Sequence, residues 1–434
     1  MVLVYVKLSL DLSSDMRLLI KLEIRESVII MNIQYVQGDC IFTRISKLTK
    51  QYEYLTEDID TDVIIVGGGV TGAILGYYFS KRNIKTVILE KSRIAHGSTS
   101  ITTSLLQYEL DSNAMELKST TSIENIVRSY ELGIKALDEI EEFMDEYGNT
   151  CDYKRVDSLL YTAKDIEKKE IEEEYIFRKE NGFPVEFFDK ESSPFSFNVK
   201  AGVLSKGGGA QFNPYKFTHA LLEVSCKKGL RVYENSEVVD VKYSENGVTL
   251  ETVFGHKVKG KIVIVATGYN THLFSKRTFG IKTTTFNIAT RPIDNLEDIH
   301  KGVVVRDNEE PYHYFRTTSD NRIIIGGEDI NFLPDILNEE LCNKNYDKLE
   351  QRLKNLFPKL KIEIEYKYCG AFASTGDNLG FLGKDPKNKK LWYCLGYGAN
   401  GILYAMLGAI MLSKLYLGEV DEDLQLFKVD RFNS

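Results

Sequence analysis

The sequence has scattered cysteines, no long uncharged apolar run and no excess of basic residues, and each absence excludes a class of protein. The six cysteines form no CxxC pair, which argues against both a disulfide framework and a zinc site. We therefore expect a reducing, cytoplasmic setting. The net charge of -8 comes from 55 basic and 63 acidic residues that are interleaved along the chain, so no nucleic-acid surface is expected.

A membrane helix needs roughly 18 apolar residues, and no run of that length is free of charge. Residues 401–418 come nearest, but Lys414 interrupts them, and they fit a buried terminal helix better. Residues 1–30 have neither the apolar core nor the small-residue cleavage site of a signal peptide. We expect no integral membrane segment. One hypothesis is that translation starts at Met31, which detection of Met1 in the native protein by mass spectrometry would exclude.

A strand, a glycine turn, a helix and a second strand follow one another in DVIIVGGGVTGAILGYYFSKRNIKTVILEK, residues 62–91. The helix is expected from about Val70 to Arg82. Glycines at this spacing allow a tight turn and the close approach of a pyrophosphate to the backbone, while the helix N-terminus supplies partial positive charge. The pattern predicts a dinucleotide site, with the GxGxxG spacing given by Gly67, Gly69 and Gly72.

The second strand ends at Glu90, which is placed to accept hydrogen bonds from ribose hydroxyls. Its carboxylate disfavours the ribose phosphate of NADP, because like charges would meet. This unit alone does not separate NAD from FAD. A hydroxyl-rich loop at residues 93–109 can donate hydrogen bonds to a pyrophosphate and a neighbouring ring. A later helix starting at Asn400–Gly401 can direct its first amides at a ligand that gains negative charge, as a reduced flavin does.

The residues in the middle of the chain indicate which later strand joins the nucleotide sheet. Residues 235–274 read as a small hairpin layer inserted between two pieces of that sheet, and the strand ending in Ala266-Thr267-Gly268 re-enters it beside the first strand. A helix before this insert is expected to have Asn213 as its N-cap and Pro214 at its first position. The charged run at residues 164–183 predicts a solvated helix with i,i+4 ion pairs.

Taken together, the motifs resemble those of the D-amino acid oxidase (DAO) family of FAD-dependent oxidoreductases, which includes glycine oxidase and sarcosine oxidase. The resemblance runs from about Tyr54 to Arg431 through DVIIVGGGVTGA, GSTS, VATGY, PYHYFRTTSDNRIIIGGED, STGDNLGFLG and GYGANGI, in the family's order. It implies that FAD is the cofactor. The cofactor-binding residues implied by the match are Gly67, Gly69, Gly72, Glu90, Lys91, Ser98, Thr99, Ser104, Leu105, Leu106, Val238, Thr267, Gly268, Gly398, Asn400, Gly401 and Ile402.

The family also implies the fold class, which is α/β. We expect a Rossmann-like FAD-binding domain, a parallel sheet with an inserted β-meander, plus an α+β substrate domain with a mainly antiparallel sheet. The predicted division is an N-terminal extension at 1–53, a discontinuous FAD-binding domain at 54–110, 201–278 and 366–434, and a substrate domain at 111–200 and 279–365.

In the family, the substrate-domain sheet faces the flavin, and alternate residues point into the cavity. The segment PYHYFR offers two sets of alternate residues. One contains Tyr312, Tyr314 and Arg316, and the other contains His313 and Phe315. We favour the first set, and we name Tyr314 and Arg316 as candidate catalytic residues of the substrate cavity.

Three departures from the family pattern concern the substrate. The family's two arginines near the substrate are replaced by Phe372 and Ala399, and its usual DGLP is DNLG at residues 377–380. A guanidinium is the natural partner of a carboxylate. Either a carboxylate is bound elsewhere, for instance by Arg316, or the substrate is an amine without one. A cysteine that tethers flavin in sarcosine oxidases falls on Gly370, one position from Cys369, so we expect non-covalent FAD.

The resemblance implies hydride transfer from the carbon beside an amine nitrogen to flavin N5, giving an imine that water hydrolyses. The substrate is then a small amine or amino acid, and the electron acceptor is oxygen or a carrier. Two other readings stay open at this point. An NAD-dependent dehydrogenase would share the βαβ unit but has no reason to carry GYGANGI. A flavin-binding protein without turnover would keep every motif and have a closed cavity.

Overall fold

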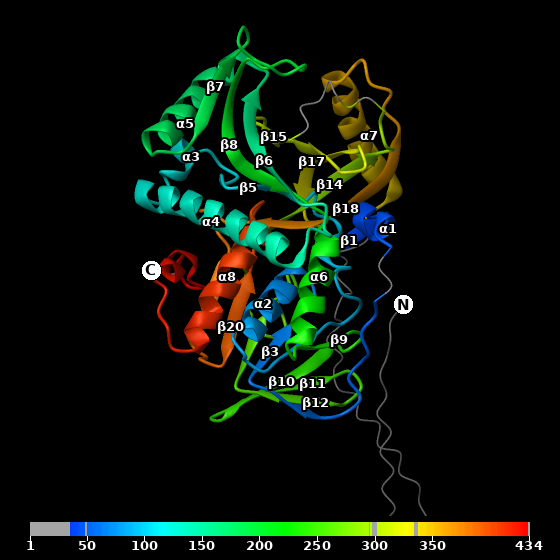
Figure 1. The fold of residues 1–434 in the computed structure, drawn as a ribbon, viewed down its shortest axis with the longest axis vertical. Helices are drawn as coiled ribbons and strands as arrows, with labels where there is room; N and C mark the ends of the chain where they lie inside the picture. Colours follow the sequence, from blue (N-terminus) through cyan, green and yellow to red (C-terminus); the bar gives the residue numbers. More distant parts are fainter. Residues whose placement is uncertain (1–34, 48–49, 295, 297–301, 334–336, 433–434) are drawn as a thin grey trace, which may run out of the picture.

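The computed structural model describes residues 35–47, 50–294, 296, 302–333 and 337–432. Three sheets and their helices form two halves, with the nucleotide half at the bottom of Figure 1 and the largest sheet at the top. The prediction for residues 1–30 lies outside the described residues. Within the described part, none of the helices combines the length and apolar composition that crossing a bilayer requires.

The nucleotide half is built on a six-stranded sheet. Its central strands are parallel and fully buried, as expected for strands covered on both faces. The predicted return of the chain is confirmed, because Ile262–Val265 pairs in parallel with Val63–Val66. The order is β19 (Phe381–Lys384), β20 (Leu391–Leu395), β13 (Ile262–Val265), β3 (Val63–Val66), β4 (Thr86–Leu89) and β9 (Arg231–Tyr233).

Three helices pack beside this sheet. The βαβ helix α2 (Val70–Lys81) lies between α6 (Pro214–Lys227) and α8 (Gly401–Tyr416) (Figure 1). The expected cap of α6 is present, since the Asn213 side chain accepts a hydrogen bond from the Lys216 amide. The apolar helix α8 is buried along almost its whole length, as its sequence predicts.

The inserted hairpin layer is also present. It is a four-stranded sheet in the order β10 (Val238–Ser244), β11 (Gly247–Thr252), β12 (Lys257–Gly260) and β2 (Ile59–Asp60). The first three strands are antiparallel, and β2 adds in parallel at the edge. Val238 is the first residue of β10 and pairs with Thr252 of β11.

The largest sheet is mainly antiparallel, with one parallel pair between β15 and β6. Helix α7 (Glu339–Leu356) covers one part of it, and α5 (Lys168–Glu180) covers another. Its strands run in the order β1 (Val36–Gly38), β18 (Ile364–Ser374), β14 (Ile281–Thr290), β17 (Ile323–Asn331), β16 (Tyr314–Thr317), β15 (Val303–Asp307), β6 (Lys154–Thr162), β8 (Ala201–Gln211) and β5 (Leu105–Gln107), with β7 (Val185–Asp189) also paired to β8.

This sheet takes in strands from outside the predicted substrate domain. Strands β5, β8 and most of β18 fall in ranges assigned to the FAD-binding domain, and β1 falls in the N-terminal extension. The sheet to which a strand belongs depends on the strands it pairs with. The residue pattern of a strand does not show which strand that partner is. The sheet therefore continues across the predicted boundaries at 110/111, 200/201 and 365/366, while the division into domains stays a prediction.

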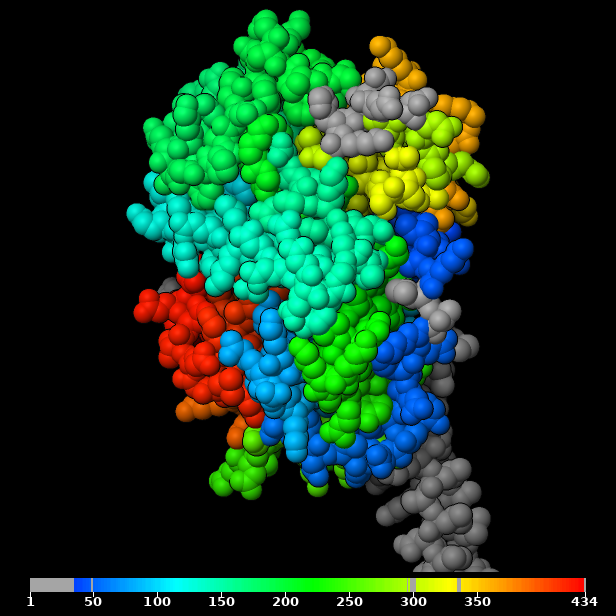
Figure 2. Space-filling model, viewed as in Figure 1, coloured from blue at the N-terminus to red at the C-terminus, as the bar shows by residue number. Residues whose placement is uncertain are grey.

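The remaining α-helices of the described residues are one long helix and two short ones. The long helix α4 (Ile123–Tyr147) crosses the middle of the molecule, where it contacts α8 (Figures 1 and 2). Ser122 caps its N-terminus by accepting a hydrogen bond from the Asn125 amide. Two short helices complete the described set, α1 (Ile41–Ile45) and α3 (Ala114–Leu117).

Helix α5 differs from the solvated helix that its charged sequence predicts. Its Glu174 and Arg178 are buried and form an ion pair, with 2.8 Å between Nε and Oε1. Arg178 also contacts Glu109 Oε1 at 2.8 Å, and Glu109 accepts a hydrogen bond from Ser205. The Tyr130 hydroxyl of α4 donates to Glu174 at 3.1 Å. These contacts tie α5 to α4 and the large sheet, and composition alone does not reveal them.

We predict that Arg178→Met lowers the free energy of unfolding by about 3–5 kcal/mol, because it leaves two carboxylates buried without their partner. Arg128→Met is the matched control. Arg128 is paired with Glu131 and Asp423 at the surface, so its loss costs about 0–1 kcal/mol. Urea unfolding followed by circular dichroism checks both values. Equal losses in the two variants would contradict the assignment of a buried network.

Candidate active site

A single cavity of about 590 Å³ connects the nucleotide half to the large sheet. Such a volume lies in the ordinary range for ligand-binding pockets. One end is lined by the glycine turn and Glu90, and the other by side chains of the large sheet. The predicted residues that line it are Gly67, Gly69, Glu90, Lys91, Ser98, Thr99, Leu105, Val238, Thr267, Gly268, Gly398, Gly401, Ile402 and Tyr314.

The glycine turn passes close to the neighbouring strand, as its sequence predicts. Gly67 has a φ of +114°, and a Cβ there would lie 2.3 Å from the Ala266 carbonyl oxygen. The Thr99 hydroxyl accepts a hydrogen bond from the Val70 amide at 2.9 Å and so fixes the GSTS loop against the first turn of α2. Backbone and hydroxyl groups therefore form a cradle of the kind that holds a pyrophosphate.

Glu90 is held in place at the end of β4. Its carboxylate accepts hydrogen bonds from the Gly68 amide at 2.7 Å and from the Ser92 amide at 2.9 Å. Burial raises the pKa of Glu90, and these two amide donors oppose the shift. Since each carboxylate oxygen accepts more than one hydrogen bond, acceptor positions remain for ribose hydroxyls. The buried Thr267 hydroxyl has no partner among the described residues and also lines this end.

The middle of the cavity is bounded by Leu105 and by the start of α8. That helix has no side-chain cap at its N-terminus; its Gly401 amide donates to the Gly398 carbonyl at 3.3 Å, and the amides that follow can face a ligand that carries negative charge. Asn400 turns away, because its Nδ2 donates to the Glu109 carbonyl at 2.8 Å. The orphaned Thr267 hydroxyl, the cradle and the uncapped helix fit a flavin dinucleotide running from Glu90 to α8.

Four predicted cofactor residues do not line the cavity. Gly72 packs against the Gly67 carbonyl, which sets the spacing of α2 from the turn. Leu106 points to the opposite face of β5 from Leu105, because side chains alternate along a strand. The others, Ser104 and Asn400, are buried behind the lining.

At the substrate end, only part of the favoured set Tyr312, Tyr314 and Arg316 points into the cavity. Tyr312 and Tyr314 line the cavity, with ring centroids 5.8 Å apart, and the Tyr314 hydroxyl lies 3.1 Å from Thr285 Oγ1. Arg316 does not line it. Its donors go to three backbone carbonyls, at 2.6 Å to Thr103, 2.9 Å to Phe212 and 3.1 Å to Thr317. Arg316 is therefore a structural residue, and the prediction that it binds substrate is wrong.

The two positions that lack the family's arginines face the cavity. Phe372 and Ala399 both line it, so this wall is apolar, as the sequence predicts. A different arginine, Arg306, lines the cavity from the end of β15. It donates from Nη1 to the Asp111 carbonyl and from Nη2 to Asn113 Oδ1 at 3.2 Å. Both terminal nitrogens are thus bonded within the protein, whereas Nε has no partner among the described residues.

A β-bulge directs Asp329 into the cavity, which the sequence analysis missed. The pairing of β14 with β17 shifts between Thr284 and Phe286, so Glu328 and Asp329 share the space opposite Thr285. Glu328 has a φ of +55°, which is uncommon for a residue other than glycine. A bulge of this kind reverses the alternation of side chains beyond it. GGED contains the residues but does not show the bulge.

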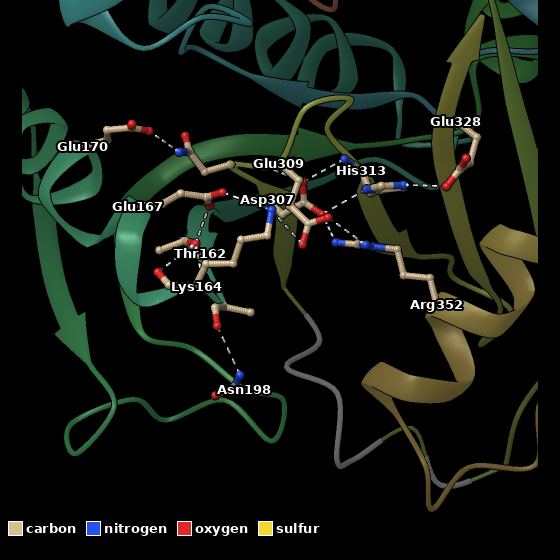
Figure 3. A network of polar contacts seen from close by, with 12 residues as sticks. Thr162, Lys164, Glu167, Glu170, Asn198, Asp307, Glu309, His313, Glu328 and Arg352 are labelled. Atoms are coloured by element: carbon tan, nitrogen blue, oxygen red, sulfur yellow. Dashed lines mark hydrogen bonds and ion pairs between the residues drawn. The ribbon is translucent and has the colours of Figure 1, made fainter.

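Behind the cavity wall lies a polar network that Figure 3 shows from close by. His313 stands between Asp307 at 3.3 Å and Glu328 at 3.2 Å. Arg352 of α7 contacts both Asp307 and Glu309. The oxygens and nitrogens of Asp307, Glu309 and His313 lie within 4.8 Å of one another, a spacing that suits a metal ion. The Arg352 guanidinium already supplies the positive charge there.

Comparison with known proteins identifies the family. The FAD dependent oxidoreductase family, DAO, matches residues 62–415. The gamma-glutamylputrescine oxidoreductase of Escherichia coli is 25% identical over 388 residues, which cover 85% of this chain and 87% of that protein. Glycine oxidase of Geobacillus kaustophilus is 23% identical over 366 residues, covering 82% of this chain and 92% of the enzyme.

The solved structures agree in fold. The crystal structure of glycine oxidase from Geobacillus kaustophilus superposes with a TM-score of 0.71 at 22% identity, covering 86% of this chain and 99% of that one. The predicted fold class, the resemblance and the use of FAD are confirmed by these findings. The chain belongs to the DAO family of FAD-dependent oxidoreductases.

Proposed function

We propose that this protein oxidises the carbon–nitrogen bond of a small amine or amino acid, using non-covalently bound FAD. Bound FAD supplies the acceptor for the hydride that leaves the carbon beside the nitrogen. The nitrogen lone pair then forms the C=N bond, the iminium loses a proton to water, and hydrolysis of the imine gives a carbonyl compound. The related proteins named above for glycine and gamma-glutamylputrescine support this class of substrate.

The observation that carries the proposal is the continuity of the cavity. The same space runs from Glu90 at the nucleotide end to Tyr312 and Tyr314 on the large sheet. A substrate at the tyrosines therefore lies next to the part of the cavity that α8 bounds. The aromatic wall excludes water and orients the substrate, and positioning of this kind contributes much of the rate in such reactions.

The geometry around Cys369 supports non-covalent attachment. Cys369 is buried in the core on the side of α7 and does not line the cavity. At Gly370, where the family's tethering cysteine aligns, a Cβ would lie 2.4 Å from the Tyr35 carbonyl oxygen and 2.3 Å from Ile101 Cδ1. Burial also raises the pKa of the Cys369 thiol to about 12, which disfavours the thiolate. The six cysteines are all unpaired, and the cytoplasmic setting remains a prediction.

The other readings have less support. An NAD-dependent dehydrogenase does not account for the match to the FAD family over residues 62–415. A flavin-binding protein without turnover would have a closed cavity at the substrate end, whereas this cavity extends beyond the start of α8 to Tyr312, Tyr314 and Asp329. The DNLG loop is also tied to the C-terminal segment, because Asp377 pairs with Arg431 at 2.6 Å.

We predict that the purified protein has an oxidised-flavin absorbance spectrum that bleaches under anaerobic conditions with an amine. The panel consists of D-amino acids, N-methyl amino acids and polyamines. Return of the oxidised spectrum on admitting air would show that oxygen is the acceptor, and a slow return would indicate a carrier. A flavin spectrum that no amine bleaches would contradict the proposed reaction, and a colourless protein that FAD cannot reconstitute would contradict the cofactor.

We also predict that Glu90→Gln raises the FAD dissociation constant about ten- to a hundredfold, because a charged hydrogen-bond acceptor is lost. Titration of the deflavinated protein with FAD, followed by flavin fluorescence, measures the constant. Glu57→Gln makes the same charge change at an exposed position of the same half and should leave it unaltered. Equal constants for Glu90→Gln and the unaltered protein would remove Glu90 from the site.

A further inference from the structure

The substrate end of the cavity contains a carboxylate whose bonding capacity is only partly used within the protein. Asp329 lines the cavity, where its Oδ2 accepts a long hydrogen bond of 3.4 Å from Thr283 Oγ1, and the Thr285 hydroxyl also interacts with the carboxylate. Its Oδ1 is buried without a donor among the described residues. A buried, charged carboxylate oxygen without a donor raises the free energy of the folded protein unless a ligand binds it, because burial disfavours its charge. The bulge at Glu328 is what brings it there.

The surroundings of Asp329 suit a cation. Tyr312 and Tyr314 line the same end of the cavity, and aromatic faces attract ammonium groups. The Arg306 guanidinium, whose centre lies 5.8 Å from the Tyr312 ring, is the cavity arginine nearest to these groups in the described part. Its two terminal nitrogens are bonded to Asp111, Leu110 and Asn113. Only its Nε has no partner among the described residues, so this guanidinium does not present two free nitrogens for bidentate binding of a substrate carboxylate.

The chemistry determines which nitrogen Asp329 can hold. A hydride leaves the carbon beside an amine only when that nitrogen has its lone pair, so the reacting amine must be neutral. An adjacent carboxylate favours the protonated form of an amine. The nitrogen beside Asp329 is consequently not the one that is oxidised.

We propose that Asp329 binds a second ammonium group of the substrate, so that the enzyme selects diamines and polyamines over monoamines and amino acids. This inference rests on the proposed amine oxidation. In this arrangement one nitrogen is anchored at the bulge of β17, the apolar stem contacts the tyrosines and Phe372, and the other end of the substrate reaches the flavin part of the cavity.

The test compares 1,4-diaminobutane with butylamine, which has the same chain length and lacks the second nitrogen. Anaerobic stopped-flow reduction of the holoenzyme gives a dissociation constant and a limiting rate for each. We expect the diamine to be preferred about ten- to a hundredfold in kcat/KM, the range for a hydrogen bond to a charged group. Asp329→Asn should remove this preference by raising the dissociation constant of the diamine, while butylamine is unaffected.

Glu328→Gln is the matched control. It removes one carboxylate from the adjacent residue, but Glu328 faces His313 and Lys348 rather than the cavity. The preference for the diamine should persist in this variant. If Asp329→Asn slowed both amines equally, or if the unaltered enzyme treated them alike, the inference would be overturned while amine oxidation stood. Failure of every amine to reduce the flavin would instead overturn the proposed function itself.

A second measurement uses the unaltered protein and does not depend on a variant folding. Burial raises the pKa of Asp329 to about 6; the charged groups that act on it are Asp111, which raises the pKa, and His313, which lowers it. The carboxylate is thus charged above that pH and neutral below it. The ratio of kcat/KM for the diamine to that for butylamine cancels the titration of the reacting amine and should fall as the pH drops below about 6. A ratio that is constant from pH 5 to pH 8 would contradict the role of Asp329.

Discussion

The alternation of side chains along β15, β16 and β17 is the constraint on which the substrate end of the cavity depends. Arg306 and Asp307 at the end of β15 face opposite ways, as do Tyr312 and His313 just before β16, so Arg306 and Tyr312 line the cavity while Asp307 and His313 enter the network behind it. At β17 the bulge maintains this division by directing Asp329 inward. The network behind the wall is closed by Arg352, and its ion pairs hold these strands in one arrangement.

The nucleotide end could be predicted because its signals are local. A glycine turn, a helix start and an acidic strand end lie within thirty residues, and backbone geometry makes each of them necessary. The substrate end is different. Tyr314 and Arg316 have the same parity, yet Arg316 lies farther along the strand, where the Thr103 and Phe212 carbonyls take its donors. The position of Arg316 is therefore set by contacts with segments that are distant in the sequence. The order of residues within PYHYFR does not reveal such contacts.

Asp329 shows a second limit of sequence reasoning. Simple alternation from Gly326, which packs beneath Tyr314, places Glu328 in the cavity and Asp329 behind it. One extra residue in the ladder exchanges the two, and a bulge depends on the partner strand as much as on its own sequence. The same holds for Tyr35, which reaches the cavity through a strand pairing of the N-terminal segment with β18. Burial of Glu174 and Arg178 in a charge-rich helix has the same origin.

We infer that one cavity holds FAD from Glu90 to α8 and a dicationic amine from there to Asp329. A crystal structure of the anaerobically reduced protein with 1,4-diaminobutane tests it most directly. We expect the adenosine at Glu90, the flavin ring beside Leu105 and the first turn of α8, and one nitrogen of the diamine hydrogen-bonded to Asp329. A diamine bound in the cavity with neither nitrogen at Asp329, or an adenosine bound away from Glu90, would contradict it.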